Sequence, residues 1–170
     1  MSLSMYSASV PVMKHMLSSL SHFLDKAAAN AEARKFEPAN IMSYRLAPDM
    51  LPFTKQIQIA CDAAKIGVCR IAGIESPKYE DNETTFAELK ARIAKTIDFL
   101  ASVPADKLDG TEDKEVTFPQ GGGTRTMTAQ AYLTTWVLPN MFFHVTTAYA
   151  ILRHNGVELG KRDYLLGAAS

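Results

Sequence analysis

The spacing of hydrophobic residues predicts four long helices in this 170-residue chain. In four segments, apolar side chains recur at intervals of three and four residues, which is the period of an α-helix with one buried face. The second of these segments has Pro52 near its first turn and Gly73 near its end, a common arrangement of the two residues at helix boundaries. The predicted helices cover residues 10–30, 52–72, 86–102 and 128–154.

Polar residues refine the boundaries and faces of these helices. Thr85 and Glu88 have the spacing of a capping box, which places the start of the third helix just after Thr85. In the first helix, His15 and His22 lie nearly opposite the apolar stripe and are predicted to face solvent. The remaining face of the third helix is charged and carries Glu88, Lys90, Arg92, Lys95 and Asp98.

Residues 114–127 break the helical period. The runs 115–118 and 124–127 flank a proline, a glutamine and three glycines, a pattern that predicts a β-hairpin of two short strands. The glycines do not lead into the Gly-Lys-Ser/Thr sequence of a phosphate-binding loop, and no βαβ unit surrounds them. Phosphate binding at this turn is therefore not expected.

Together these segments predict an all-α four-helix bundle with a short β-hairpin before the last long helix. The length of the chain suits a single domain that spans residues 1–170, and no internal repeat divides it. The stretch 36–49 is assigned only as a linker with a short helical turn.

Composition and charge exclude several classes of function. The 18 basic and 18 acidic side chains balance, and no basic run stands out, so nucleic acid is not an expected partner. Residues 126–152 lack charged side chains but contain too many polar ones for a membrane span, and no secretory signal is evident at the N-terminus. Cys61 and Cys69 lie too far apart on one helix for a disulfide, which suggests a reducing compartment and a cytoplasmic location.

His144 is the candidate for chemistry. On a helical projection it shares its direction with apolar residues, and Asn140 lies one turn earlier on the same side. The two side chains could hold a ligand or metal together, or His144 could be a buried imidazole bonded to Asn140, Gln58 or a threonine. Pro139 predicts a kink that opens space near them. The residues expected to border one internal pocket are His144, Asn140, Trp136, Gln58 and Asp62.

The chain resembles the DinB/YfiT-like superfamily of metal-dependent bundle proteins, and within it a branch known only as a domain of unknown function. The resemblance to the superfamily rests on the four helices and on the segment 151–156 after His144. The resemblance to the branch rests on the segments 46–50, 81–86 and 138–161 and covers nearly the whole chain. It implies the DinB-like bundle fold and pairing of the bundles into homodimers. Members that bind nickel or zinc use one histidine from the second long helix and a His-x-x-x-His pair from the last. In this chain His144 takes the second place of that pair and Asn140 the first, while the second helix offers only Gln58 and Asp62.

Such a degenerate ligand set predicts no cofactor, because an amide oxygen is a weak ligand for zinc or nickel. Three functions remain open at this point. The first is a binding protein with a polar pocket for a small molecule around His144 and Asn140. The second, implied by the resemblance, is a metal- or thiol-dependent transferase or isomerase, with His144 as a general base. The third is a non-catalytic structural or interaction protein that acts as a homodimer.

Overall fold

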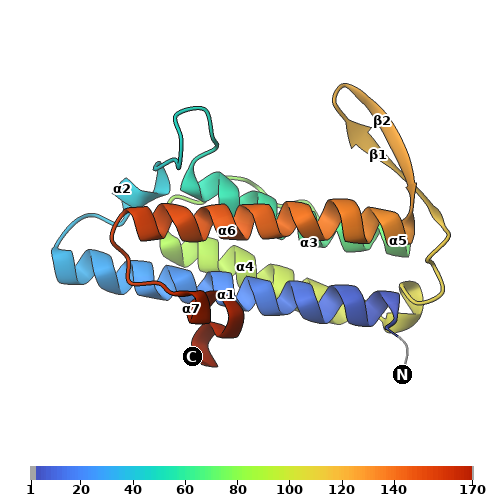
Figure 1. Cartoon of the computed structure of the whole chain (residues 1–170), viewed down its shortest axis with the longest axis horizontal. Helices are drawn as coiled ribbons and strands as arrows, with labels where there is room; N and C mark the ends of the chain where they lie inside the picture. Colours follow the sequence, from blue (N-terminus) through green and yellow to red (C-terminus); the bar gives the residue numbers. More distant parts are fainter. Residues whose placement is uncertain (1–2, 170) are drawn as a thin grey trace.

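The computed structural model describes residues 3–169 as a bundle of four long helices (Figure 1). They are α1 (Met5–Arg34), α3 (Phe53–Ala72), α4 (Phe86–Ser102) and α6 (Leu138–His154). Helix α3 packs on α6 and α4, and α1 packs on α4 and α6, so the four helices enclose one core. The predicted all-α bundle with a β-hairpin before the last long helix is confirmed.

Short elements connect and extend the bundle. The stretch 36–49, predicted as a linker with a helical turn, contains only the four-residue helix α2 (Ala39–Met42). A coil of residues 73–85 joins α3 to α4. The remaining elements are a 3₁₀ turn (Ala105–Lys107), strands β1 (Glu115–Gln120) and β2 (Gly123–Thr128), helix α5 (Ala129–Tyr132), a π-helical segment (Leu133–Val137), helix α7 (Lys161–Leu166) and a terminal 3₁₀ turn (Gly167–Ala169).

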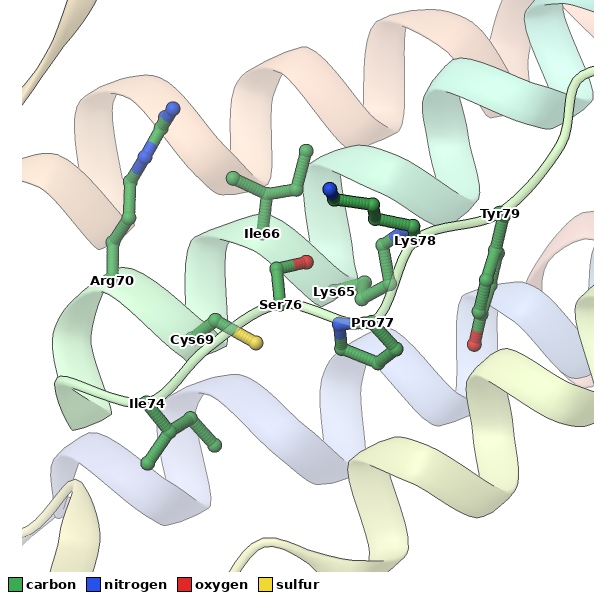
Figure 2. A pocket seen from close by; sticks show the side chains of 9 residues that line it. All are labelled: Lys65, Ile66, Cys69, Arg70, Ile74, Ser76, Pro77, Lys78 and Tyr79. Carbon is green, nitrogen blue, oxygen red and sulfur yellow. The ribbon is translucent and has the colours of Figure 1, made fainter.

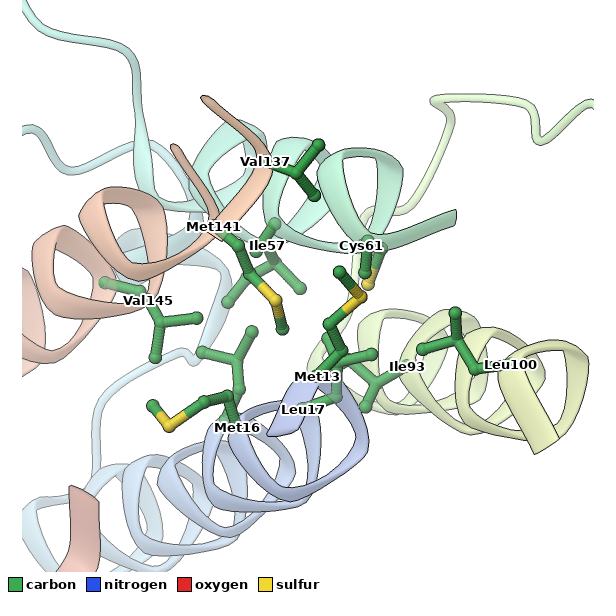
Figure 3. Packing of buried hydrophobic residues seen from close by; sticks show 14 of the residues in the cluster. Met13, Met16, Leu17, Ile57, Cys61, Ile93, Leu100, Val137, Met141 and Val145 are labelled. Atoms are coloured by element: carbon green, nitrogen blue, oxygen red, sulfur yellow. The ribbon is translucent and has the colours of Figure 1, made fainter. Parts of the chain in front are cut away.

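The core consists of apolar side chains that the helical period predicted. Figure 3 shows Met13 and Leu17 of α1, Ile57 and Cys61 of α3, Ile93 of α4 and Met141 of α6 meeting between the helices. Cys61 is free and fully buried, and its burial raises the pKa of its thiol to about 12. This thiol is therefore a packing group and not a nucleophile at neutral pH.

The hairpin is anchored through one face of β1. Val116 and Phe118 are buried, and the Phe118 ring packs against Tyr132 at 4.7 Å and Trp136 at 5.0 Å between ring centroids. At the tip, Gly121 and Gly122 have φ angles of 57° and 84°, the pair of positive values that a two-residue type I′ turn requires. The glycine run therefore serves the turn.

The predicted helix 128–154 consists of three consecutive pieces, α5, the π-helical segment and α6. Thr128 caps its start and it ends at His154, in agreement with the prediction. Pro139 has no N–H to donate to the Thr135 carbonyl, and the wider π-helical turn lies directly before α6, where the proline is one of the first two residues. Among residues 3–169, every helix is too short or too polar to serve as a membrane span.

The C-terminal helix α7 folds back against α1, as Figure 1 shows. Asp163 of α7 accepts hydrogen bonds from His22 and Lys26 of α1, both at 2.9 Å. The prediction that His22 faces solvent is wrong: its side chain is only 18% exposed because α7 covers it. The apolar period of α1 could not reveal this contact, which involves the polar side of the helix.

Candidate functional site

His144 lies on α6 at the contact with the first turns of α3. The residue is 7% exposed, and its Nδ1 is 2.7 Å from Oε1 of Gln56. The side-chain amide of Gln56 in turn donates from Nε2 to the carbonyl oxygen of Leu51 at 2.8 Å. A chain of two hydrogen bonds therefore links the imidazole to the backbone just before α3.

This chain fixes the tautomer of His144. A carbonyl oxygen can only accept, so Gln56 must present Nε2 to Leu51 and Oε1 to the imidazole. Because Oε1 is also only an acceptor, the proton of the neutral imidazole lies on Nδ1 and a lone pair remains on Nε2. Burial lowers the pKa of His144, which favours this neutral form at pH 7.

The Nε2 atom of His144 has no hydrogen-bond partner within residues 3–169. This atom is also not completely buried, so solvent can reach it. The neighbouring Phe143 is 55% exposed and its ring meets the imidazole edge to face at 5.2 Å. Asn140, one turn earlier, is partly buried and makes no side-chain hydrogen bond within the described part of the chain. The site is thus a neutral acceptor beside an exposed aromatic ring.

The other sequence-predicted site residues lie elsewhere. Gln58 donates to Glu83 at 2.8 Å, and Asp62 pairs with Lys65 and Arg92. Trp136 packs on the hairpin and shares with Asp62 a small cleft of about 110 Å³. Five grooves on the surface of residues 3–169 are lined by other side chains and not by His144 or Asn140. The structure does not bring the five residues into a single pocket.

A buried ionic cluster on α4 was not evident from the sequence. Arg92 belongs to the charged face of α4, yet its side chain is only 2% exposed. It contacts Asp62 at 3.1 Å, Asp81 at 3.1 Å and Glu83 at 2.9 Å, and so ties α3, α4 and the 73–85 coil together. In the sequence, the only indication of this cluster is the concentration of acidic residues at positions 80–83.

The cluster keeps its carboxylates ionised. Burial alone would raise the pKa of Glu83, but hydrogen bonds from Arg92 and Gln58 outweigh burial and lower it. The pKa of Asp81 is lowered in the same way by Lys55 and Arg92 against the effect of burial. These acids are therefore structural counter-ions and not proton donors near neutral pH.

The residues around His144 do not fit a zinc or nickel ion. Its Nδ1 is engaged by the amide of Gln56, and the side chain one turn earlier on α6 is the amide of Asn140. No group of three or more histidine, cysteine, aspartate or glutamate side chains within residues 3–169 is arranged to hold a metal. Amide oxygens with one imidazole are a poor donor set for these ions.

Comparison with known families and structures agrees with the fold. A family model described as "Domain of unknown function (DUF1993)" matches residues 5–165. The crystal structure of a DinB family member protein from Shewanella denitrificans is 40% identical, with a TM-score of 0.89, over 94% of this chain and 90% of that chain. Comparison with curated proteins gave no match.

Proposed function

Because the chain belongs to the DUF1993 family and has the DinB-like fold, we propose that it is a small-molecule-binding bundle protein. The proposed site is centred on His144 and works without a tightly bound transition metal. The observation that carries the proposal is the hydrogen-bond chain from His144 through Gln56 to Leu51, which fixes a neutral imidazole with an open Nε2 lone pair.

The surroundings of Nε2 define the ligand chemistry. A lone pair on a neutral nitrogen accepts a hydrogen bond, so the ligand carries an O–H, N–H or S–H donor. The exposed ring of Phe143 offers an apolar contact beside it, and the free side-chain amide of Asn140 offers a second polar contact one turn away. A small neutral molecule with a donor next to an apolar body suits this arrangement.

Binding is favoured over catalysis by the partner of the imidazole. A carboxylate at Nδ1 would raise the basicity of His144 and favour a general base. Asp62 could have supplied one, but it pairs with Lys65 at 3.0 Å and Arg92 at 3.1 Å instead. Gln56 is neutral, so it orients the ring without strengthening it as a base.

Protein NMR with a fragment set of phenols, primary amides and thiols tests the proposal. Binders should perturb the His144 ring and nearby amides, and raise the melting temperature of the native protein. Both effects should disappear in His144→Ala and weaken in Asn140→Leu. His154→Ala, at the exposed end of the same helix, is the matched control and should bind normally. Fragments that bind His144→Ala as well as the wild type would refute the site.

Self-association is a second candidate function, and exposed apolar side chains support it. Two large apolar side chains close to the His144–Gln56 pair in sequence are well exposed, Phe143 at 55% and Leu51 at 45%. Apolar surface of this kind marks an interaction site when it is contiguous. We propose that this surface pairs two copies of the chain. Analytical ultracentrifugation of the wild type and Phe143→Ser should show a dimer that the substitution dissociates, whereas a wild-type monomer would exclude it.

A further inference from the structure

A groove on the other side of α3 has a different chemistry. It lies between the C-terminal half of α3 and residues 74–79 of the connecting coil, and it has a volume of about 560 Å³ (Figure 2). This volume is within the range of about 300–1,000 Å³ that is usual for small-ligand sites. Its first residue on α3, Lys65, is nine positions beyond Gln56, which separates the groove from the His144 site by about 14 Å along the helix.

The charge of the groove is one-sided. Lys65, Arg70 and Lys78 line it, and none of its nine lining residues is an aspartate or glutamate. Figure 2 shows Lys78 extending from the coil towards α3. Basic side chains gathered in a concave surface concentrate positive potential and attract anions.

Two of these cations have no acidic partner in the part of the chain that the structure describes. Lys78 makes no ion pair or hydrogen bond to any residue that the structure describes. Within residues 3–169, Arg70 donates only to the neutral hydroxyl of Tyr132, at 2.9 Å, and its guanidinium lies 5.8 Å from the centroid of the Phe118 ring, which leaves most of its five N–H donors unused. Lys65 differs because it is paired with Asp62, which it shares with the buried Arg92. Arg70 and Lys78 are therefore the groups available to an anion.

Apart from its cations and Ser76, the groove is lined mostly by apolar side chains, and its outer wall is anchored. Ile66, Ile74 and Pro77 contribute hydrophobic surface, and the ring of Tyr79 lies under the ammonium group of Lys65, 3.8 Å from the ring centroid. The coil that forms the outer wall is held by the salt bridges of Arg92 to Asp81 and Glu83. A wall fixed in this way does not have to be ordered when a ligand binds, which favours affinity.

Covalent chemistry does not fit this groove. Its thiol, Cys69, is buried, and this burial raises the pKa of Cys69 above the ordinary value. A thiol that is protonated at neutral pH is a poor nucleophile. The remaining lining side chains bind by charge, hydrogen bonding and apolar contact.

From these contacts we propose that the groove binds a small organic anion with an apolar body, either a phosphate monoester or a carboxylate. Arg70 and Lys78 hold the anionic group, and Tyr79 with Ile66 and Ile74 contacts the body. The proposal is independent of the His144 site and concerns a second ligand.

Titration of the tag-free protein with phenyl phosphate and benzoate, followed by calorimetry and amide NMR, tests the proposal. At least one of the two should bind, shift the amides of residues 65–79 and lose affinity as salt is added. The tighter of the two identifies the anionic group. Inorganic phosphate and benzyl alcohol, which each supply half of the ligand, should bind at least tenfold more weakly.

Substitutions connect the binding to the groove. Lys78→Gln and Arg70→Gln should each weaken the complex about tenfold, as expected for the loss of one charge-assisted hydrogen bond. Lys78 is exposed and unpaired, so this variant keeps the fold even if Arg70→Gln does not. Lys107→Gln, at another exposed lysine, and His144→Ala should leave binding unchanged. Absence of binding by both organic anions, equal binding of either half-ligand, or full affinity in Lys78→Gln would overturn the proposal.

Discussion

Replacing Arg92 with methionine should destabilise the bundle because the guanidinium is the shared partner of three carboxylates. After the change, Asp62 keeps Lys65 and Asp81 keeps Lys55. Glu83, which is only 10% exposed, keeps no cation and is left with the amide of Gln58. Breaking a buried ion pair by removing one partner costs about 3–5 kcal/mol. We expect about 3 kcal/mol, since two of the three carboxylates remain paired and partly solvated.

The dependence of this loss on pH has a defined sign. In the wild type, the lowered pKa values of Glu83 and Asp81 stabilise the fold above the pKa of the unfolded carboxyls, and this stability is lost as the pH falls through the folded-state values. In Arg92→Met, an isolated buried Glu83 should have a raised pKa. The variant should therefore recover stability relative to the wild type when the pH is lowered from neutral towards the pKa of Glu83.

Urea unfolding followed by circular dichroism at pH 7 and pH 5 measures both effects. Lys90→Met is the matched control, because Lys90 lies on α4 like Arg92 but forms an exposed ion pair with Asp25 of α1, whose loss should cost less than about 1 kcal/mol. Adding Glu83→Gln to Arg92→Met should recover part of the loss at neutral pH. A loss no larger than that of the control, or a loss that does not shrink at pH 5, would refute the reasoning.

Three further predictions concern packing, the C-terminus and metal. Gly67→Ala should destabilise the protein by about 1–3 kcal/mol, because its Cβ would lie 2.5 Å from a methyl group of Val137, and Val137→Ala should reverse most of the loss in chemical denaturation. Asp163→Asn should release α7 and speed the exchange of the α7 amide hydrogens. In the wild type the pKa of Asp163 is lowered to about 2, so the contact holds at pH values above the ordinary aspartate pKa and is lost as the pH falls towards 2. Elemental analysis of tag-free protein should find no stoichiometric nickel or zinc, whereas metal that is lost in His144→Ala would restore the metalloenzyme interpretation.

The helices of the bundle could be predicted from the sequence because the buried face of each long helix is visible in the spacing of its apolar residues. The three-and-four spacing along α3 and α4 and the capping box at Thr85 depend on local rules, and the structure reproduces them closely. The π-helical segment before Pro139 was predicted only as a kink, because a proline shows that the helix must adjust but not how it does so. The docking of α7 on His22 joins residues 141 positions apart and left no periodic signal.

The site was predicted less completely because it depends on how two helices are turned towards each other. The projection of α6 correctly placed His144 in the bundle interior. It could not choose among the polar residues of α3, and the partner is Gln56 and not Gln58 or Asp62. Arg92 looked like part of a charged surface because its acidic partners lie on another helix and in a coil. Its burial becomes visible only when the coil is placed over it.

The proposed site depends on His144 being a neutral imidazole with its proton on Nδ1 and an open lone pair on Nε2. Long-range ¹H–¹⁵N NMR of the histidine rings tests this directly. At pH 7, Nδ1 of His144 should have the shift of a protonated nitrogen and Nε2 that of an unprotonated one, and Gln56→Leu should disturb this pattern. Because burial lowers the pKa of His144, the ring should also stay mostly neutral when the pH falls to the ordinary pKa of histidine. A ring protonated on Nε2, or on both nitrogens at pH 7, would contradict the account.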